Sequence, residues 1–242
     1  MHELTEEELI DRIVDFFEEK IFDNHMAASL KTHSKLRSYK INPIVVEYLS
    51  KVLEDAYTPE GIAKALYYPR VLGTSITTIF GTQIQNMFVE LNIGRGSLIK
   101  GMDIEFRDCV DGRNKWCQLK SGPNTINSED VNPLVKKFSE TINLAKTNRA
   151  YSEIRNTDFV VGVLYGDPEE LSSHYKRIDE KHPVIIGRDF WHRITGFPNF
   201  YDKLVVALRE RIYSLNTSSF FEMGCSQLAN EIRKSPLFKF AD

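Results

Sequence analysis

Most of the chain shows apolar residues at helical spacing. Apolar residues recur every three or four positions in four segments, and these are residues 4–22, 43–70, 75–92 and 128–146. A further helical region is predicted from about Phe190 to Phe238, with breaks at Gly196 and Pro198. The chain is therefore predicted to be rich in helix.

Three shorter segments have the patterns of β-strands. The sequence FVVGVLYG at 159–166 is a continuous apolar run of the kind that forms a strand covered on both faces, and PVIIG at 183–187 repeats the pattern more weakly. Residues 101–120 predict a hairpin that turns at Asp111-Gly112, a dipeptide that favours a two-residue type I′ turn. The order of these elements predicts an α/β protein in the broad sense, with a mixed β-sheet flanked by helices.

The predicted turn determines which residues of the hairpin face each other. Residues whose numbers sum to 223 then pair, so Asp103 lies opposite Lys120, and Glu105 lies opposite Gln118. These four polar side chains share one face of the hairpin. The other face is apolar, and its residues are Ile104, Phe106, Cys117 and Leu119. A slip of one residue would exchange the two faces, so the pattern supports this arrangement.

Composition is that of an ordinary globular protein. Of the residues, 42% are hydrophobic and 27% are charged, which excludes a disordered or fibrous protein. A length of 242 residues corresponds to one or two domains, and we expect one core domain with a helical N-terminal extension. No window approaches the ~20 apolar residues of a membrane span. The N-terminus is acidic and amphipathic, whereas a secretory signal has positive charge followed by an apolar run. We therefore expect a cytoplasmic protein without a membrane partner.

Cysteine and charge usage narrow the chemistry further. The three cysteines have no CxxC spacing, which argues against a disulfide framework and a zinc site. The sequence contains no GxxxxGK(S/T) loop, so we expect no nucleotide cofactor. A net charge of −3 does not by itself favour a nucleic-acid partner. One segment, 29–40, has no acidic residue and either contacts DNA phosphates or forms a solvated connection between helices. Its basic residues are Lys31, Lys35, Arg37 and Lys40.

The polar face of the hairpin has two interpretations. The first is a solvated surface, on which a cross-strand Asp-Lys pair contributes only a few tenths of a kcal/mol. The second is a site for a hard divalent cation such as Mg²⁺, held by a carboxylate and a second oxygen ligand, with phosphate oxygens completing its shell. A neighbouring lysine would then orient or help deprotonate an attacking water and offset the charge that develops at phosphorus. This second interpretation predicts phosphodiester hydrolysis.

The motif around the hairpin resembles that of a known nuclease superfamily. An Asp followed about 15 residues later by (D/E/Q)-x-K on the neighbouring strand is similar to the PD-(D/E)XK active-site motif, and here it consists of Asp103, Gln118 and Lys120. The segments GMDIEF, QLKSGPNTINSED, FVVGVLYG and GRDFWHRITG, followed by FYDKLV, resemble the PmeII-type family of type II restriction endonucleases. The resemblance covers about residues 75–215. It implies a PD-(D/E)XK nuclease core with C-terminal helices at 71–242, and leaves 1–70 as a helical region for dimerisation or DNA contact.

The resemblance implies a role for each residue of the motif. Asp103 is the principal metal ligand, and Lys120 is the catalytic lysine. Gln118 stands where the superfamily most often has an acid, and its amide oxygen still coordinates a cation but adds no charge. Glu105 shares the face and is expected to compensate for the missing acid. The carbonyl of Leu119 lies where such sites recruit a main-chain oxygen.

Further candidates lie outside the motif. Glu90, on the helix before the hairpin, lies about 80° from the centre of its apolar face, and is either an auxiliary acid or a boundary residue. Gln85 is predicted to face the opposite side. The loop after the second hairpin strand either contacts the DNA backbone or forms turns and caps the next helix, and its candidates are Ser121, Asn124 and Asn127. Additional candidates for DNA contact are His174, Tyr175, Lys176, Arg188 and His192.

Together these features predict a type II restriction endonuclease that cuts double-stranded DNA at a specific sequence and requires Mg²⁺. A homodimer is expected, because a two-fold symmetric site calls for two active sites with the same symmetry. One alternative is a structure-specific or repair nuclease on the same fold, in which residues 1–70 bind a DNA junction. Another is a DNA-binding protein whose metal site has decayed, in which Gln118 has replaced the usual acid.

Overall fold

The computed structural model describes residues 4–147 and 154–240. The chain forms two compact units, each made of two segments. The first, which we call the sheet unit, consists of Met1–Asp15 with Gly81–Glu210, and the second, the helical unit, consists of Phe16–Phe80 with Arg211–Asp242. The predicted division between residues 1–70 and 71–242 followed motif similarity and expected role, and it stays a prediction.

The helical unit confirms the predicted helices and shows why they begin where they do. The Asn42 side chain accepts the N–H groups of Ile44 and Val45 at 3.2 and 3.4 Å, and the Thr58 hydroxyl accepts that of Gly61 at 3.0 Å. Each cap precedes a proline, which suits the first position of a helix. Its elements are η1 Phe17–Phe22, α2 Asp23–Ala28, η2 Ser29–His33, η3 Leu36–Ser38, α3 Pro43–Glu54, α4 Pro59–Pro69, η4 Arg70–Ser75, the start of α5 Ile76–Glu90, and α10 Ser218–Lys234.

The core of the helical unit lies mainly between α4 and α10. Ile62, Tyr67, Leu228 and Ile232 have no exposed side-chain surface, and they pack in one apolar cluster. Among the residues described, no helix combines the length and the apolar character that crossing a lipid bilayer requires.

The sheet unit contains a mixed five-stranded sheet, which confirms the predicted α/β class. The strands lie in the order of the chain: β1 Arg95–Gly96, β2 Ile104–Arg107, β3 Asn114–Lys120, β4 Phe159–Val163 and β5 Val184–Ile186. The first three are antiparallel, and β3, β4 and β5 are parallel. The remaining elements are α1 Glu6–Phe16, α6 Ser128–Thr147, η5 Asn156–Asp158, η6 Pro168–Glu170, α7 Ser173–Asp179, α8 Gly187–Thr195 and α9 Phe200–Ser214.

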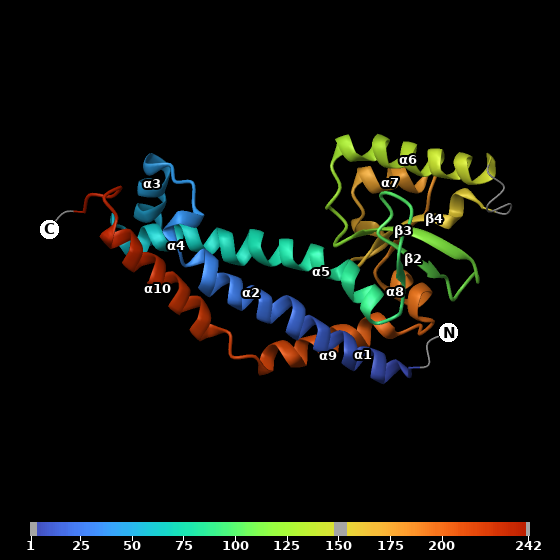
Figure 1. The fold of residues 1–242 in the computed structure, drawn as a ribbon, viewed down its shortest axis with the longest axis horizontal. Coiled ribbons are helices and arrows are strands. Elements are labelled where there is room, and N and C mark those ends of the chain that lie inside the picture. Colours follow the sequence, from blue (N-terminus) through green and yellow to red (C-terminus); the bar gives the residue numbers. More distant parts are fainter. Residues whose placement is uncertain (1–3, 148–153, 241–242) are drawn as a thin grey trace. The chain divides into compact units, whose positions relative to one another are not determined.

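Helices cover both faces of this sheet (Figure 1). On one face, Trp116 and Val161 belong to a buried cluster with residues of α6 and α7. On the other, the Phe190 ring of α8 packs edge-on against Phe88 and Phe106. A Cβ atom at Gly162 of β4 would lie 2.8 Å from the Cys117 sulfur and closer still to the Phe190 ring, so only glycine permits this packing. The predicted apolar face of the hairpin is thus confirmed, but the opposite face is also largely covered.

The hairpin pairs two positions away from the predicted register. Ile104 lies opposite Cys117 and Glu105 opposite Trp116, so paired residue numbers sum to 221. Because the shift is an even number of residues, each side chain keeps the predicted face. The correction changes partners across the strands. Asp103, whose N–H donates to the Cys117 carbonyl at 2.9 Å, falls opposite Gln118 instead of Lys120 when this register is extended by one residue.

The cause of the shift is Asp108. Its carboxylate accepts the N–H groups of Val110 at 2.8 Å and Asp111 at 3.3 Å, which forms an Asx-type turn. Asp108 then pairs with Arg113, and four residues form the loop between them. Among these four residues, only Gly112 has a positive φ. The Asp111-Gly112 signal therefore marked the loop correctly but not the turn type.

A buried ion cluster holds this end of the hairpin. The Lys115 ammonium, 3% exposed, lies 2.6 Å from Asp111 and 3.7 Å from Asp158. Asp158 also accepts hydrogen bonds from Arg113 Nε at 2.7 Å and from the Arg155 N–H at 2.8 Å. Burial acts to raise the pKa of Asp158, but these hydrogen bonds outweigh it and hold the pKa below its ordinary value.

We expect Asp158→Asn to lower the free energy of unfolding by about 3 kcal/mol at pH 7, because it removes one negative charge from a buried cluster that holds Lys115 and Arg113. A carboxyl with a depressed pKa stabilises the fold above its unfolded pKa of about 3.9, and this contribution disappears as the pH falls through the folded value. The difference from wild type should therefore shrink below about pH 4 in urea unfolding. Asp189→Asn, at an exposed pair with Arg193, is the control and should cost less than about 1 kcal/mol. Equal losses in the two variants would contradict the prediction.

Candidate functional site

The sheet brings the three motif residues together. Asp103 immediately precedes β2 beside Gln118, and Lys120 follows two residues later on the same face of β3. The Asp103 Oδ2 atom accepts the Leu119 N–H at 2.7 Å, which fixes the carboxylate against the strand. Because the N–H and C=O of a strand residue point to the same side, the Leu119 carbonyl is directed towards the Asp103 strand as well.

Burial makes Asp103 a carboxyl group that is reluctant to ionise alone. Burial raises the pKa of Asp103 above its ordinary value, while the Leu119 N–H and the charges of Lys120 and Lys137 act to lower it. A bound cation would shift this balance towards the carboxylate.

Gln118 carries an unfilled acceptor at the same place. Its Oε1 atom is buried and has no hydrogen-bond partner among the residues that the structure describes. A buried polar atom without a partner costs about 1–3 kcal/mol, which favours an additional group at this position.

The oxygen donors fit a hard divalent cation. The Asp103 carboxylate, the Gln118 amide oxygen and the Leu119 carbonyl are all oxygen ligands of the kind that Mg²⁺ prefers. Within residues 4–147 and 154–240, no three His, Cys, Asp or Glu side chains are grouped so that they could hold a metal. A metal at this position would therefore depend on the amide and on a main-chain oxygen.

The two additional acids lie in other surroundings. The Glu105 carboxylate is nearly buried, and it accepts hydrogen bonds from Arg95 Nη2 at 2.8 Å and Ser97 Oγ at 2.9 Å. Its role as a compensating ligand stays a prediction, but its oxygens already bind the edge strand. Glu90 is exposed at the end of α5.

Gln85 contacts the site instead. Its Nε2 atom donates to the Asp103 carbonyl at 2.8 Å, so the prediction that Gln85 faces away was wrong. That prediction treated α5 as one amphipathic helix with a single buried side. In the sheet unit, the buried residues of α5 are Ile84, Met87 and Phe88, and Gln85 lies at the edge of this set.

The loop after β3 presents its polar candidates differently. Asn124 and Asn127 are exposed, and Ser121 is half-buried. The loop is fixed by the Tyr175 hydroxyl, which donates to the Gly122 carbonyl at 3.1 Å. Tyr175 is fully buried, so its prediction as a DNA contact was wrong.

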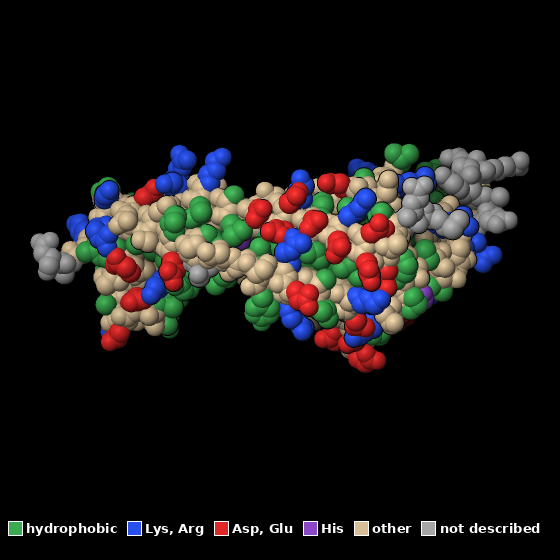
Figure 2. Space-filling model, turned by 90° about the horizontal axis from the view of Figure 1, so that it is seen from below, with side chains coloured by type: hydrophobic (Ala, Val, Ile, Leu, Met, Phe, Trp, Pro, Cys, Tyr) green, Lys and Arg blue, Asp and Glu red, His purple; other side chains and the backbone are tan. Residues whose placement is uncertain are grey.

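The basic segment lies in the helical unit, and its cations are not equivalent. Lys31, Arg37 and Lys40 are exposed. Lys35 is half-buried and lies 3.4 Å from Glu231 of α10, which also accepts the Leu36 N–H at 2.7 Å. Figure 2 shows side chains of both charge signs on each unit, so neither unit presents a uniformly basic surface on this face.

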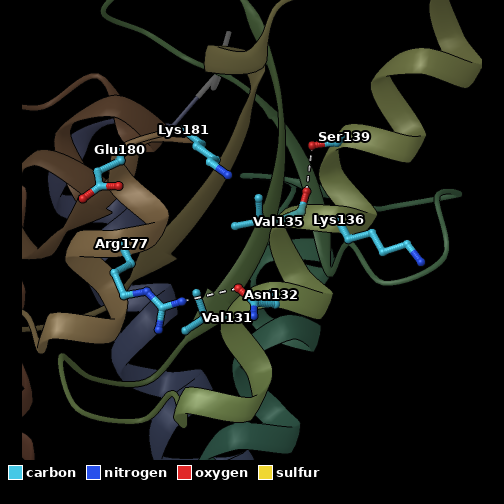
Figure 3. A pocket seen from close by; sticks show the side chains of 8 residues that line it. All are labelled: Val131, Asn132, Val135, Lys136, Ser139, Arg177, Glu180 and Lys181. Atoms are coloured by element: carbon cyan, nitrogen blue, oxygen red, sulfur yellow. Dashed lines mark hydrogen bonds between the residues drawn. The ribbon is translucent and has the colours of Figure 1, made fainter.

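Two surface grooves of the sheet unit lie outside the motif. One, of about 450 Å³, runs between α6 and α7, where Arg177 Nη2 donates to Asn132 at 3.4 Å (Figure 3). Its lining is Val131, Asn132, Val135, Lys136, Ser139, Arg177, Glu180 and Lys181, and includes no motif residue. The other, of about 870 Å³, lies along β1, β2 and the hairpin loop, next to the end of α8, and its lining includes Glu105 and Arg95.

Comparison with known proteins gives a family match that covers most of the chain. The family model described as type II restriction endonuclease EcoO109I matches residues 5–216. A comparison with curated proteins gave no match.

Proposed function

The chain belongs to the family of type II restriction endonuclease EcoO109I, and from this premise we propose that it hydrolyses double-stranded DNA at a specific sequence with Mg²⁺. We further propose that its site is of the PD-(D/E)XK kind, close to the PmeII type. The observation that carries the proposal is the position of Asp103 beside Gln118, whose buried amide oxygen lacks a partner.

The motif residues have distinct tasks in this proposal. Asp103, Gln118 and the Leu119 carbonyl would hold Mg²⁺, which when bound neutralises phosphate charge and makes water a stronger acid. Lys120 orients the attacking water and offsets negative charge at the phosphorus as the new P–O bond forms and the bond to the leaving sugar oxygen breaks. Gln85 keeps Asp103 in place by holding its carbonyl.

We also propose that the active form is a homodimer, with the helical unit as its interface. On α3, Ile44, Tyr48 and Val52 follow one another at four-residue spacing, and they are 82%, 68% and 61% exposed. An exposed apolar stripe of this kind marks an interaction surface. A second copy is its expected occupant, because a symmetric DNA site requires two active sites. Sedimentation of the purified chain as a monomer at micromolar concentration would contradict this proposal.

The basic residues of segment 29–40 are proposed to contact DNA phosphates. Replacing all four of Lys31, Lys35, Arg37 and Lys40 by alanine should weaken DNA binding. It should also make the negative slope of log affinity against log salt shallower, by up to about one unit per lost contact. Binding titrations over a salt series measure this slope. An unchanged slope would assign the segment to its alternative role as a solvated connection.

Plasmid digestion tests the proposed function against its alternatives. With Mg²⁺, discrete bands are expected from a restriction endonuclease. Cuts confined to branched DNA would favour a structure-specific nuclease, and retarded but uncut DNA would favour a binding protein with a decayed site. Sequencing the ends of the fragments would then identify the recognition sequence.

A further inference from the structure

Lys137 of α6 reaches the motif from outside the hairpin. A Cβ atom added to Gly101 would coincide with the Lys137 ammonium group and the carbon next to it. The side chain therefore lies directly on the glycine, two residues before Asp103, and its charge acts on the Asp103 carboxylate. Gly101 has a φ of +87°, a conformation that itself favours glycine.

The position of Lys137 on α6 explains why its side chain extends to Gly101. Leu134 and Phe138 of α6 are buried against the sheet, and Lys137 lies beside this buried stripe and is half-buried. A lysine at such a position packs its methylene groups along the protein and directs its ammonium group past the edge. Lys136, the neighbouring residue, points elsewhere: it lines the α6–α7 groove and lies 3.7 Å from Glu140 (Figure 3).

Within the described residues, the Lys137 ammonium forms no hydrogen bond or ion pair, and its charge acts on Asp103 through space. The four side chains Asp103, Gln118, Lys120 and Lys137 carry a formal charge of +1 when Asp103 is ionised. With an acid in place of Gln118 the same four would be neutral. The site thus has an excess positive charge before any metal binds, and an anion would complement it.

We propose that Lys137 is a second active-site cation, whose ammonium group contacts a phosphate oxygen of the DNA strand to be cut. This inference rests on the proposed nuclease function. Lys137 then adds attraction for DNA in the absence of metal, and it opposes the negative charge that grows on the phosphate oxygens in the transition state.

The test compares Lys137→Met with Lys136→Met, which removes the same charge one residue away. DNA binding is measured in a chelator over a salt series, and cleavage is measured at saturating Mg²⁺. Lys137→Met should make the negative slope of log affinity against log salt shallower by about 0.9. It should also reduce the cleavage rate by about 10²-fold. Lys136→Met should leave both near wild type, and Lys137→Arg should restore the slope.

Several outcomes are distinguishable. Thermal denaturation identifies a variant that has merely lost its fold, and Lys137→Arg keeps the charge as an independent measurement in that case. If the slopes and rates of Lys137→Met and Lys136→Met coincide, the inference is wrong while the nuclease function stands. If the wild-type chain neither binds nor cuts DNA, the proposed function fails and this inference fails with it.

Discussion

Asp103→Asn and Lys120→Met are each expected to lower the rate of DNA cleavage to less than about one hundredth of the wild-type value. Asparagine removes the negative charge at the proposed metal site but retains an oxygen for the Leu119 N–H. Asp103→Ala should be equally inactive and also less stable by about 1 kcal/mol, because the Leu119 N–H loses its partner. Methionine at residue 120 keeps much of the lysine bulk but cannot orient water or offset charge.

Single-turnover cleavage and thermal denaturation together check this expectation. Lys181→Met is the control, because Lys181 is an exposed cation in the α6–α7 groove, outside the motif. A well-folded Asp103→Asn or Lys120→Met variant that retains more than a tenth of the wild-type rate would contradict the assigned site. Equal losses in Lys181→Met would indicate a general effect of charge on DNA binding.

The strand pattern of the hairpin was predictable because alternation survives an error of two residues. Ile104 and Phe106 faced the core under either register, and Asp103, Gln118 and Lys120 stayed on one face. The register itself depended on the Asx-type turn of Asp108, a residue that the turn dipeptide does not include. Local sequence therefore predicted the faces but not the partners.

The contacts of Gln85 and Lys137 could not be predicted from the sequence, for a different reason. Both side chains come from helices that flank the hairpin, and their relevance depends on how those helices pack against it. Gln85 belongs to a helix whose two ends lie in different units, so a single amphipathic axis misplaces it. A signal for Lys137 existed only in Gly101, where a glycine near the motif leaves room for a side chain from elsewhere.

Substitutions at Gln118 are expected to separate stability from metal use. Gln118→Leu removes a buried acceptor that has no partner, so it should raise the free energy of unfolding by about 1 kcal/mol in a chelator. The same change removes a proposed oxygen ligand, so the Mg²⁺ concentration for half-maximal cleavage should rise by about tenfold or more. A purely structural role for Gln118 would give the gain in stability without the change in metal requirement.

Gln118→Glu should act in the opposite direction. An added carboxylate lies close to Asp103, so without metal the two like charges should destabilise the fold, and bound Mg²⁺ should remove this penalty. Half-maximal cleavage should therefore need less Mg²⁺ than in wild type. Metal titrations of cleavage, paired with unfolding in the presence and absence of Mg²⁺, measure both effects for all three forms.

If Gln118→Leu needs no more Mg²⁺ than wild type, another oxygen holds the metal, and Glu105 or Glu90 would have to leave its present surroundings to supply it. If wild type cuts nothing and only Gln118→Glu is active, the chain is a DNA-binding protein whose site has decayed, because one restored charge then suffices to recover the chemistry.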